Sequence, residues 1–544
     1  MKERTVRGIL VAIFMATTML LLAAGRQEDA SAARASAAPH DPFGKYEPTV
    51  TLTAVRDTIA AFEFPAGDCI ENNVWTREIE ATLGIRVRYD WTIDMSQYAH
   101  RLNLAIVSGD LPDFFLADRN VFRNLAENAL LADLTDAYEN YATPEFRATM
   151  DAFPEGFESA HLEGRLYGIS PQGWGIMSVL PVLWIRDDWM QQLDLKPPES
   201  IADLEAIATT FVVANPENRT DMHGVSLWKD YFGGLQNIEG IANAHHAYPG
   251  IWIRDASGQI VYGSIQPEMR NTLQTLQKWY DAGILSQEYG IKTHNACNED
   301  LISGRVGIQF GHCWNSRWPL NALVQNDQDA VFKPHAIPSV DGNQVSVQAT
   351  FPVANYWVVN KDCDYPEAAI KMANLFNRML YHGTPEEYVT FIRNEQGHGL
   401  EKLSPIHPTD PRTDYRKHVL ISEAIRTGDA SGLSAELMAD YDSLMPWVEN
   451  RDPVGYGPYY HLGPEGSYSV LREFVDSDNV MMTELRGVNP PTMVDKWATL
   501  FKLEQDAYTK VIIGGDITEF DRFVENWLRL GGEQITREMN EMYK

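Results

Sequence analysis

Hydrophobic and polar positions alternate along the first part of the chain in a way that predicts strands and helices in turn. Two stretches alternate with the period of a strand, residues 50–55 and 86–89. Two others carry apolar residues at helical spacing, residues 75–83 and 98–107. The fully apolar run 114–117 then predicts a short strand buried on both faces, as in a parallel sheet. This order of elements predicts a doubly wound α/β lobe.

Further helices are predicted later in the chain, two of them at a proline that suits a first helical turn. Their ranges are 201–211, 267–280 and 367–376. The C-terminus is expected to be almost wholly helical. There Thr518 and Asp521 have capping-box spacing, an apolar stripe follows, and Gly531–Gly532 is expected to end the helix. The stripe consists of Phe520, Phe523, Trp527 and Leu530 and predicts core packing.

The N-terminus has the pattern of a signal peptide. Three cationic residues (Lys2, Arg4, Arg7) precede the apolar stretch 9–22 and the small residues 23–25. The stretch is shorter than the roughly 20 residues of a membrane-spanning helix, so we interpret residues 1–25 as a removable signal; the alternative is an uncleaved membrane anchor. Arg26 stands where a lipoprotein would have its cysteine. Residues 26–45 are predicted to form a disordered tether. The protein is therefore expected to be exported, to the periplasm or the extracellular space.

Length and charge narrow the picture further. A chain of 544 residues is too long for one core and is expected to form two large lobes. The net charge of −30 argues against binding to nucleic acid or to anionic lipid.

The four cysteines include no CxxC pair. Cys297 and Cys313 are near enough in sequence to form a disulfide, and the alternative is that all four are small buried residues.

Several short segments, widely spaced and in a fixed order, together resemble the extracellular solute-binding proteins of family 1. The most similar branch contains the alginate-oligosaccharide binders and the lipoproteins of complex-sugar importers. The segments are 108–113 (SGDLPD), 164–169 (GRLYGI), 183–189 (LWIRDDW), 195–198 (LKPP), 261–267 (VYGSIQP), 304–307 (GRVG), 520–523 (FDRF) and 531–536 (GGEQIT).

The resemblance implies a two-lobed periplasmic-binding-protein fold. Each lobe would be a mostly parallel sheet flanked by helices, with hinge strands between the lobes and a helical C-terminus. The first part of the N-lobe would be residues 46–175 and the C-lobe 176–350. Residues 351–544 would return to the N-lobe and add the C-terminal helices. The ligand would lie between the lobes, at the carboxyl ends of the strands.

The same resemblance implies a function. The protein would be a monomer that captures an oligosaccharide by closing its lobes and delivers it to the permease subunits of an ABC transporter. Two alternatives keep the fold: the ligand is a peptide or another small solute, or the partner is a sensor kinase.

The first candidate binding residues follow the strand 114–117. Sugars offer hydroxyl edges and flat C–H faces, so planar polar groups and aromatic rings are the side chains to look for. Asp118 and Arg119 resemble an Asp-Arg pair that bonds sugar hydroxyls in maltose-binding proteins, although the aromatic residue preceding that pair is missing here. The alternative is a solvated turn that caps the next helix at Asn120.

The second candidates follow the strand 307–310. Trp314 resembles a tryptophan that stacks on the sugar in maltose binders, and Trp318 would share its face if this loop begins a helix. The alternative for Trp314 is packing between the lobes or in a core.

The third candidates lie on the predicted hinge segments. They are Trp174, which is flanked by glycines, and Tyr356 and Trp357, of which only one is expected to face the ligand because neighbouring strand residues point to opposite sides. A further loop, 455–461, carries three tyrosines (Tyr456, Tyr459, Tyr460) that we expect on the surface near the cleft.

No metal or cofactor is expected. Many relatives carry a calcium loop where this chain has residues 215–224, but this loop is shorter and Arg219 would bring a positive charge among the oxygen ligands. A polysaccharide-cleaving enzyme, the rival class, would need two carboxylates across the scissile bond, and no catalytic motif frames such a pair. We therefore expect a binding protein with no catalytic residues.

Overall fold

The computed structural model describes residues 41–58, 62, 64–171, 175–230, 234–394 and 399–543. The predicted signal peptide and most of the predicted tether lie outside these residues. The last tether residues, 41–45, are packed against the protein: the buried Lys371 donates a hydrogen bond from Nζ to the carbonyl oxygen of Gly44 at 2.8 Å. Ordered structure therefore begins earlier than the sequence indicates.

The first lobe is built on a five-stranded sheet in the order β2-β1-β3-β14-β6. Strands β2 and β3 run parallel to β1, as predicted, whereas β14 runs antiparallel to both of its neighbours. The strands are β1 (Val50–Asp57), β2 (Ile85–Ile93), β3 (Phe114–Asp118), β6 (Gly168–Ile169) and β14 (Asn355–Val359).

The apolar spacing predicts three of the helices that cover this sheet, α2, α3 and α14. Asn73 begins α2 by accepting hydrogen bonds from the backbone N–H groups of Trp75 and Thr76, and Gly84 ends it in the left-handed conformation. The helices of this lobe are α2 (Val74–Leu83), α3 (Met95–Ser108), α4 (Arg119–Glu127), α5 (Thr135–Tyr141), α6 (Pro144–Asp151), α7 (Pro154–Glu158), α14 (Glu367–His382) and α15 (Pro385–Glu387).

The second lobe has a four-stranded sheet in the order β12-β7-β11-β8. Strands β8 and β11 are parallel neighbours, and β7 runs antiparallel to both of its own neighbours, β11 and β12. Three strands of this sheet therefore run in one direction and β7, which enters from the hinge, runs in the other, so the sheet is mixed. The strands are β7 (Val182–Arg186), β8 (His223–Ser226), β11 (Val306–Gly311) and β12 (Phe332–His335). The helices are α8 (Asp187–Gln192), α9 (Ile201–Ala214), α10 (Glu239–Ala244), α11 (Glu268–Asp281), α12 (His294–Ile302) and α13 (Leu320–Asn326).

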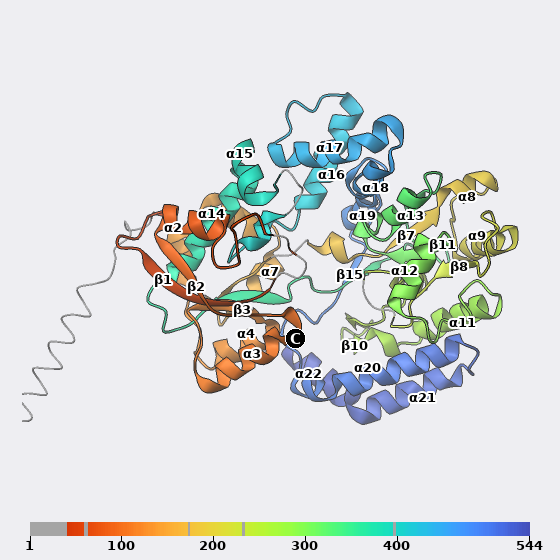
Figure 1. The fold of residues 1–544 in the computed structure, drawn as a ribbon. Helices are drawn as coiled ribbons and strands as arrows, with labels where there is room; N and C mark the ends of the chain where they lie inside the picture. The colour runs from red at the N-terminus through yellow and green to blue at the C-terminus, as the bar shows by residue number, and fades with distance from the viewer. Residues whose placement is uncertain are drawn as a thin grey trace, which may run out of the picture.

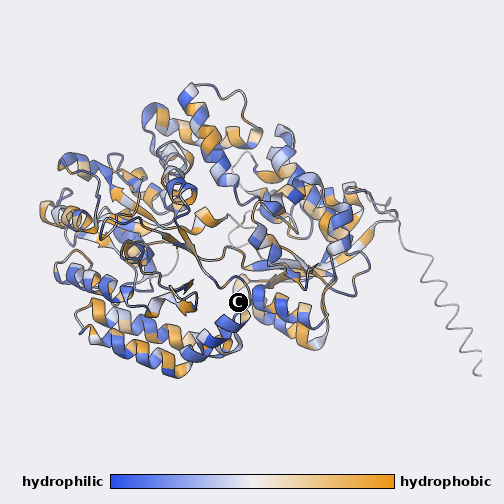
Figure 2. Cartoon of the chain, turned by 180° about the vertical axis from the view of Figure 1, so that it is seen from behind, coloured by the Kyte–Doolittle hydropathy of each residue, from blue (hydrophilic) through white to orange (hydrophobic). Residues whose placement is uncertain are grey.

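The buried apolar residues form two separate cores, one under each sheet. Figure 1 shows the two lobes side by side, with the first sheet in one and the second sheet in the other. Figure 2 shows apolar and polar residues alternating around the C-terminal helices, which is the pattern of helices with one buried face. These helices pack on the second core. They are α16 (Thr413–Thr427), α17 (Ala435–Asn450), α18 (Tyr456–Leu462), α19 (Ser467–Asp476), α20 (Pro491–Ile512), α21 (Thr518–Trp527) and α22 (Glu533–Met542). Short strand pairs β9 (Trp252–Arg254) with β10 (Ile260–Tyr262) and β13 (Val347–Ala349) with β15 (Val480–Met482) complete this lobe.

Three local predictions about this part of the chain are wrong. The buried stripe ends at Trp527, because Leu530 lies beyond the end of α21 and is 43 % exposed. Thr518 is the first residue of α21 and does not cap it; its N–H and hydroxyl both donate to Asp516, which is placed two residues earlier and reaches them directly. The predicted tyrosine loop is helix α18, in which Tyr456 and Tyr460 are fully buried, because its glycines leave room for close packing: Gly457 lies against Ser316 and Arg317.

The two lobes are connected by several segments of the chain. One runs between β6 and β7, a second enters β14, and a third, before α16, lies beside the first: the Thr409 N–H donates to the Pro171 carbonyl at 3.1 Å. Gly175, with φ at +73°, approaches the Pro411 carbonyl so closely that a Cβ would lie 2.2 Å from its oxygen. Among the described residues, no helix has both the length and the apolarity to cross a bilayer.

Helix α20 is attached to the second lobe through a buried carboxylic acid. Glu504 is fully buried and accepts a hydrogen bond from the Tyr262 hydroxyl at 2.9 Å, and burial raises the pKa of Glu504 to about 7. Because this pKa lies above the ordinary value of 4.5, stability is lost as the pH rises from 4.5 through 7. We expect Glu504→Gln to raise the melting temperature at pH 8 relative to the parent protein and to change it little at pH 5. Differential scanning calorimetry checks this, with the exposed Glu525→Gln on α21 as a control that should show no such pH dependence.

Candidate functional site

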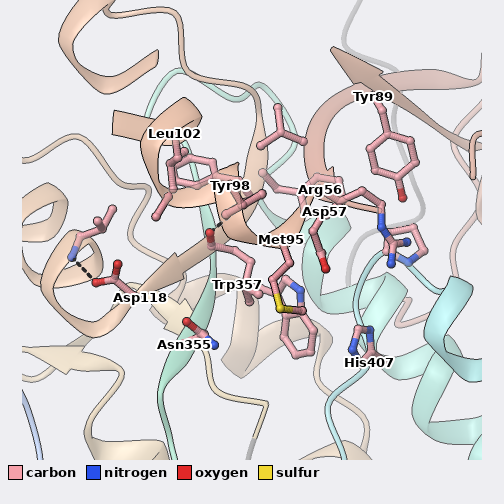
Figure 3. A pocket seen from close by; sticks show the side chains of 17 residues that line it. Arg56, Asp57, Tyr89, Met95, Tyr98, Leu102, Asp118, Asn355, Trp357 and His407 are labelled. Atoms are coloured by element: carbon pink, nitrogen blue, oxygen red, sulfur yellow. Dashed lines mark hydrogen bonds between the residues drawn. The ribbon is translucent and has the colours of Figure 1, made fainter. Parts of the chain in front are cut away.

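A cavity of about 250 Å³ lies at the carboxyl ends of the parallel strands of the first lobe. Strands β1 and β3 end there, which is where open α/β sheets bind their ligands. We call it the first-lobe pocket. Its polar and aromatic lining residues are Arg56, Asp57, Tyr89, Tyr98, Asp118, Asn355, Trp357 and His407, and Met95 and Leu102 add apolar surface (Figure 3).

Asp118 and Asn355 form one side of the pocket. They are directly opposite each other in the antiparallel pair β3–β14. Asp118 caps α4, since its Oδ1 accepts hydrogen bonds from the backbone N–H groups of Asn120 and Val121 at 2.8 and 3.0 Å. The alternative for this turn placed the helix cap at Asn120, whereas the cap is Asp118, and its exposed carboxylate still lines the pocket.

Arg119, the other member of the predicted pair, lies outside the pocket lining. Its backbone N–H donates to the Ala354 carbonyl at 3.2 Å, and its Nη1 is buried without a hydrogen-bond partner among the described residues.

Arg56, Tyr89 and His407 form another side of the pocket. Arg56 is held by two carbonyl oxygens, with Nη2 donating to Lys402 at 2.9 Å and Nη1 to Leu403 at 3.3 Å. Burial raises the pKa of Tyr89 and lowers the pKa of His407 to about 4, so the imidazole is neutral near pH 7.

Of the two neighbouring hinge aromatics, only Trp357 lines the pocket. Its ring meets His407 edge to face, with centroids 4.8 Å apart. Tyr356 is 1 % exposed; it packs on Phe122, and its hydroxyl donates to Ser159 Oγ at 2.7 Å. Tyr356 is thus a core residue of the first lobe in this conformation, because the alternation of the strand turns it away from the pocket.

In the second lobe, Trp314 lies in a short 3₁₀ turn (Cys313–Ser316) directly after β11. The turn is fixed from both sides: Asn315 Nδ2 donates to the Gly234 carbonyl at 2.9 Å, and Ser467 Oγ donates to the Cys313 carbonyl at 2.9 Å. The side chain of Trp314 is half-buried against the second core. A rigid, half-exposed indole at the end of a parallel strand is a suitable platform for a sugar face.

The position of Trp314 depends on Gly234. A Cβ at residue 234 would lie 2.2 Å from Cζ2 of Trp314, so a side chain there must displace the indole. We expect Gly234→Ala to reduce ligand affinity about fivefold while the protein stays folded, since the displaced ring loses part of its contact area. Isothermal titration calorimetry checks this. Gly432→Ala is the control, because a Cβ at residue 432 has open space around it.

The other predicted aromatic residues have different positions. Trp318 is 49 % exposed, after the 3₁₀ turn and before α13, so the loop does not begin as the regular α-helix that would place it on the same face as Trp314. Trp174 lies outside the described residues.

Cys297 and Cys313 are both buried free thiols, with Cys297 near the Leu227 carbonyl and Cys313 near the Tyr468 hydroxyl.

Sequence reasoning missed most of the first-lobe pocket. Arg56 and Asp57 end β1 in the same way that Asp118 ends β3, so the argument applied to one strand end would have found the other. No such signal marks His407, which lies in an irregular segment after Leu403 that packs on the first-lobe core.

Residues 215–224, the loop compared with a calcium site, contribute two side chains to a network of ion pairs. Glu217 contacts Arg186 Nη2 at 2.6 Å and Arg219 Nη2 at 3.2 Å. Burial acts to raise the pKa of Glu217, but its bonds to Arg186 outweigh this and lower it. Within the described residues no group of three or more His, Cys, Asp or Glu side chains is arranged to hold a metal ion.

The model of one protein family matches residues 76–378 of the chain, more than half of its length. That family is described as bacterial extracellular solute-binding protein. The chain belongs to this family. The resemblance found from the short segments is thereby confirmed, and the pocket and the Trp314 turn are parts of a solute-binding protein.

Two curated relatives match this solute-binding protein, one over most of its length and one over about a quarter of it. The polygalacturonan/rhamnogalacturonan-binding protein YtcQ of Bacillus subtilis is 22 % identical over 485 residues, which cover 86 % of this chain and 87 % of YtcQ. A fructooligosaccharide ABC transporter substrate-binding protein, FusA of Streptococcus pneumoniae, is 30 % identical over 151 residues, 26 % of this chain and 27 % of FusA.

Solved structures show the same two-lobed fold. A solute-binding protein of Bifidobacterium longum infantis, described as HMO binding and ABC-transporter associated, has a TM-score of 0.61 and 17 % identity, and the match covers 91 % of this chain and 98 % of the other. The alginate-binding protein AlgQ2, solved without calcium ion, has a TM-score of 0.57 and 17 % identity over the same shares. The predicted fold class is confirmed, with the sheets mixed as described above.

Proposed function

We propose that this solute-binding protein captures an oligosaccharide between its two lobes and delivers it to the permease subunits of an ABC transporter. The observation that carries the proposal is the first-lobe pocket, in which hydrogen-bonding groups and aromatic rings lie together at the strand ends. That combination suits the hydroxyl edges and C–H faces of a sugar. The names of relatives point the same way, since YtcQ and FusA are named for binding polysaccharide or oligosaccharide.

We propose roles for the candidate residues on each side of the ligand. On the first lobe, Asp118 would accept hydrogen bonds from hydroxyl groups and Trp357 would contact a sugar face. On the second lobe, Trp314 would stack on the ligand and the exposed Trp318 would contact it when the lobes close. Arg119 would act at the edge of the cleft, and Trp174, which lies outside the described residues, stays a predicted ligand contact. Tyr356 would support Trp357 from behind and would not touch the ligand.

The mechanism we propose is hinge closure. One lobe would comprise residues 46–175 and the chain that returns from residue 351. The other lobe would comprise residues 176–350, and the C-terminal helices would be added to it. Ligand that contacts both lobes stabilises the closed form over the open form, because only the closed form makes both sets of contacts. The protein would act as an exported monomer, freed from its signal at about residue 25, and the permease would recognise the closed shape.

Calorimetric titration of the mature protein against a panel of oligosaccharides tests this function. We expect at least one ligand of three to six sugar units to bind with a micromolar or lower Kd, and mass spectrometry should recover that ligand at its original mass. A protein that binds no glycan in the panel, or that releases shorter fragments from one, would contradict the proposal.

A further inference from the structure

The charged groups of the first-lobe pocket differ in how far the protein itself already engages them. Three ionisable side chains of fixed charge line it, Arg56, Asp57 and Asp118. A pocket that recognises a carboxylate needs its cation free to donate, and one that recognises hydroxyl groups needs free acceptors. Which of these groups remains available therefore indicates the kind of sugar that fits.

The cation is already engaged by the protein. Both terminal nitrogens of Arg56 donate to backbone carbonyls, those of Lys402 and Leu403, and its Nε is buried without a partner among the described residues. The guanidinium binds a carboxylate best through two parallel N–H donors on one edge. One edge of Arg56 is taken by the carbonyls and the other contains the enclosed Nε. Figure 3 shows the guanidinium turned toward Tyr89, and its Cζ lies 5.8 Å from the centre of that ring.

The carboxylates are free to accept hydrogen bonds. Asp57 lies at the carboxyl end of β1, and within the part of the chain that the structure describes its carboxylate has neither a hydrogen bond nor an ion pair. Asp118 uses only Oδ1 to cap α4. Each free carboxylate oxygen accepts a hydrogen bond from a hydroxyl group and repels another carboxylate.

The remaining polar groups add no positive charge. Asn355, beside Asp118, carries a neutral amide that both donates and accepts. His407 is enclosed against Trp357, and its Nδ1 lies 3.2 Å from the Ser404 carbonyl, so it carries the proton there and leaves Nε2 as an acceptor. The accessible surface of the pocket is therefore acceptor-rich and negative.

We propose that the first-lobe pocket selects uncharged sugar units over uronates, and that Asp57 sets this choice by repelling a ligand carboxylate. The inference rests on the proposed function and narrows it to neutral oligosaccharides. It separates this chain from relatives named for binding polygalacturonan or alginate, which are polymers of uronic acids.

Competition between matched tetrasaccharides tests the inference. The neutral set contains maltotetraose, xylotetraose, mannotetraose and nystose, and the acidic set contains tetragalacturonate and tetramannuronate. We expect the tightest neutral ligand to bind at least tenfold more tightly than either uronate at pH 7 in 20 mM salt. Because the discrimination is electrostatic, raising the salt to 500 mM should lower the ratio of neutral affinity to uronate affinity. Uronate binding that equals or exceeds neutral binding overturns the inference and leaves the proposed function standing, whereas binding of neither set overturns both.

A variant isolates the contribution of Asp57. Asp57→Asn keeps the shape and one acceptor oxygen but removes the charge, so it should strengthen uronate binding at least threefold relative to neutral binding. The Asp57 carboxylate has no hydrogen-bond or ion-pair partner among the described residues, so the melting temperature should stay within a degree or two of the parent value. Asp281→Asn, on the exposed end of α11 in the other lobe, makes the same change in net charge and should leave the ratio unchanged. If the ratio of uronate affinity to neutral affinity is the same in Asp57→Asn as in the parent protein, Asp57 does not set the choice of ligand.

Discussion

Replacing Trp314 by alanine is expected to weaken oligosaccharide binding at least tenfold. The indole is the large aromatic side chain that the turn after β11 offers beside the second core, and Asn315 and Ser467 hold that turn in place before ligand arrives. A stacked ring held in advance contributes its contact with little loss of side-chain freedom. A tenfold loss corresponds to about 1.4 kcal/mol. Isothermal titration calorimetry with the tightest ligand of the panel gives the ratio directly.

A matched control separates this effect from a general loss of packing. Trp497 on α20 is also half-buried and packs edge to face on Tyr262, with centroids 5.2 Å apart, but it belongs to the C-terminal helices and not to the pocket or the Trp314 turn. Trp497→Ala should lower stability and leave affinity unchanged. Unchanged affinity in a folded Trp314→Ala protein would remove Trp314 from the site.

The largest expected effect on stability comes from Arg186. This side chain is 1 % exposed and forms ion pairs of 2.6 Å with both Asp188 and Glu217, while its guanidinium lies 4.2 Å from the ring of Trp189. Arg186→Met removes the cation that Asp188 and Glu217 share, and leaves Glu217 only its longer ion pair with the exposed Arg219. Removal of one partner from a buried ion pair costs about 3–5 kcal/mol, and since both carboxylates keep some exposure we expect about 3 kcal/mol. Urea unfolding followed by tryptophan fluorescence measures it.

The pH dependence of this effect has a definite sign. The pKa of Glu217 is lowered in the folded protein, despite burial, by its bonds to Arg186, so the ion pair stabilises the protein above pH 4.5 and loses its effect as the pH falls further. The difference between parent and Arg186→Met should therefore shrink below that pH. Arg86→Met is the control, because Arg86 pairs with Glu80 on the surface and exposed pairs contribute less than about 1 kcal/mol. Equal losses in the two variants would contradict the buried-pair interpretation.

Most of the fold follows from local patterns in the sequence. The alternation in residues 50–55 and the helical spacing in residues 75–83 correspond to β1 and α2. The pattern did not predict strand direction in the second lobe, because β7 is apolar on both faces whichever way it runs. An apolar run predicts that a strand lies in the middle of a sheet. Its direction depends on the path of the chain through the hinge, which the run does not show.

The candidate site was predictable where a single strand end carries the chemistry. Asp118 and Trp314 each follow a buried strand directly, so their place at a sheet edge could be inferred. Tyr356 and Trp357 could be assigned to opposite faces, but which of them faces the pocket depends on the register of β14 against β3. His407 and the carbonyls that hold Arg56 come from segments without periodicity, and their approach to the pocket is a property of the tertiary fold alone.

Small-angle X-ray scattering of the mature protein, with and without a saturating neutral oligosaccharide, tests whether the two lobes close around the ligand. We expect the radius of gyration to fall on addition of ligand, because the first-lobe pocket and the Trp314 turn belong to different lobes and must approach each other to contact one solute. A radius of gyration that stays constant while calorimetry shows the site to be full would contradict it.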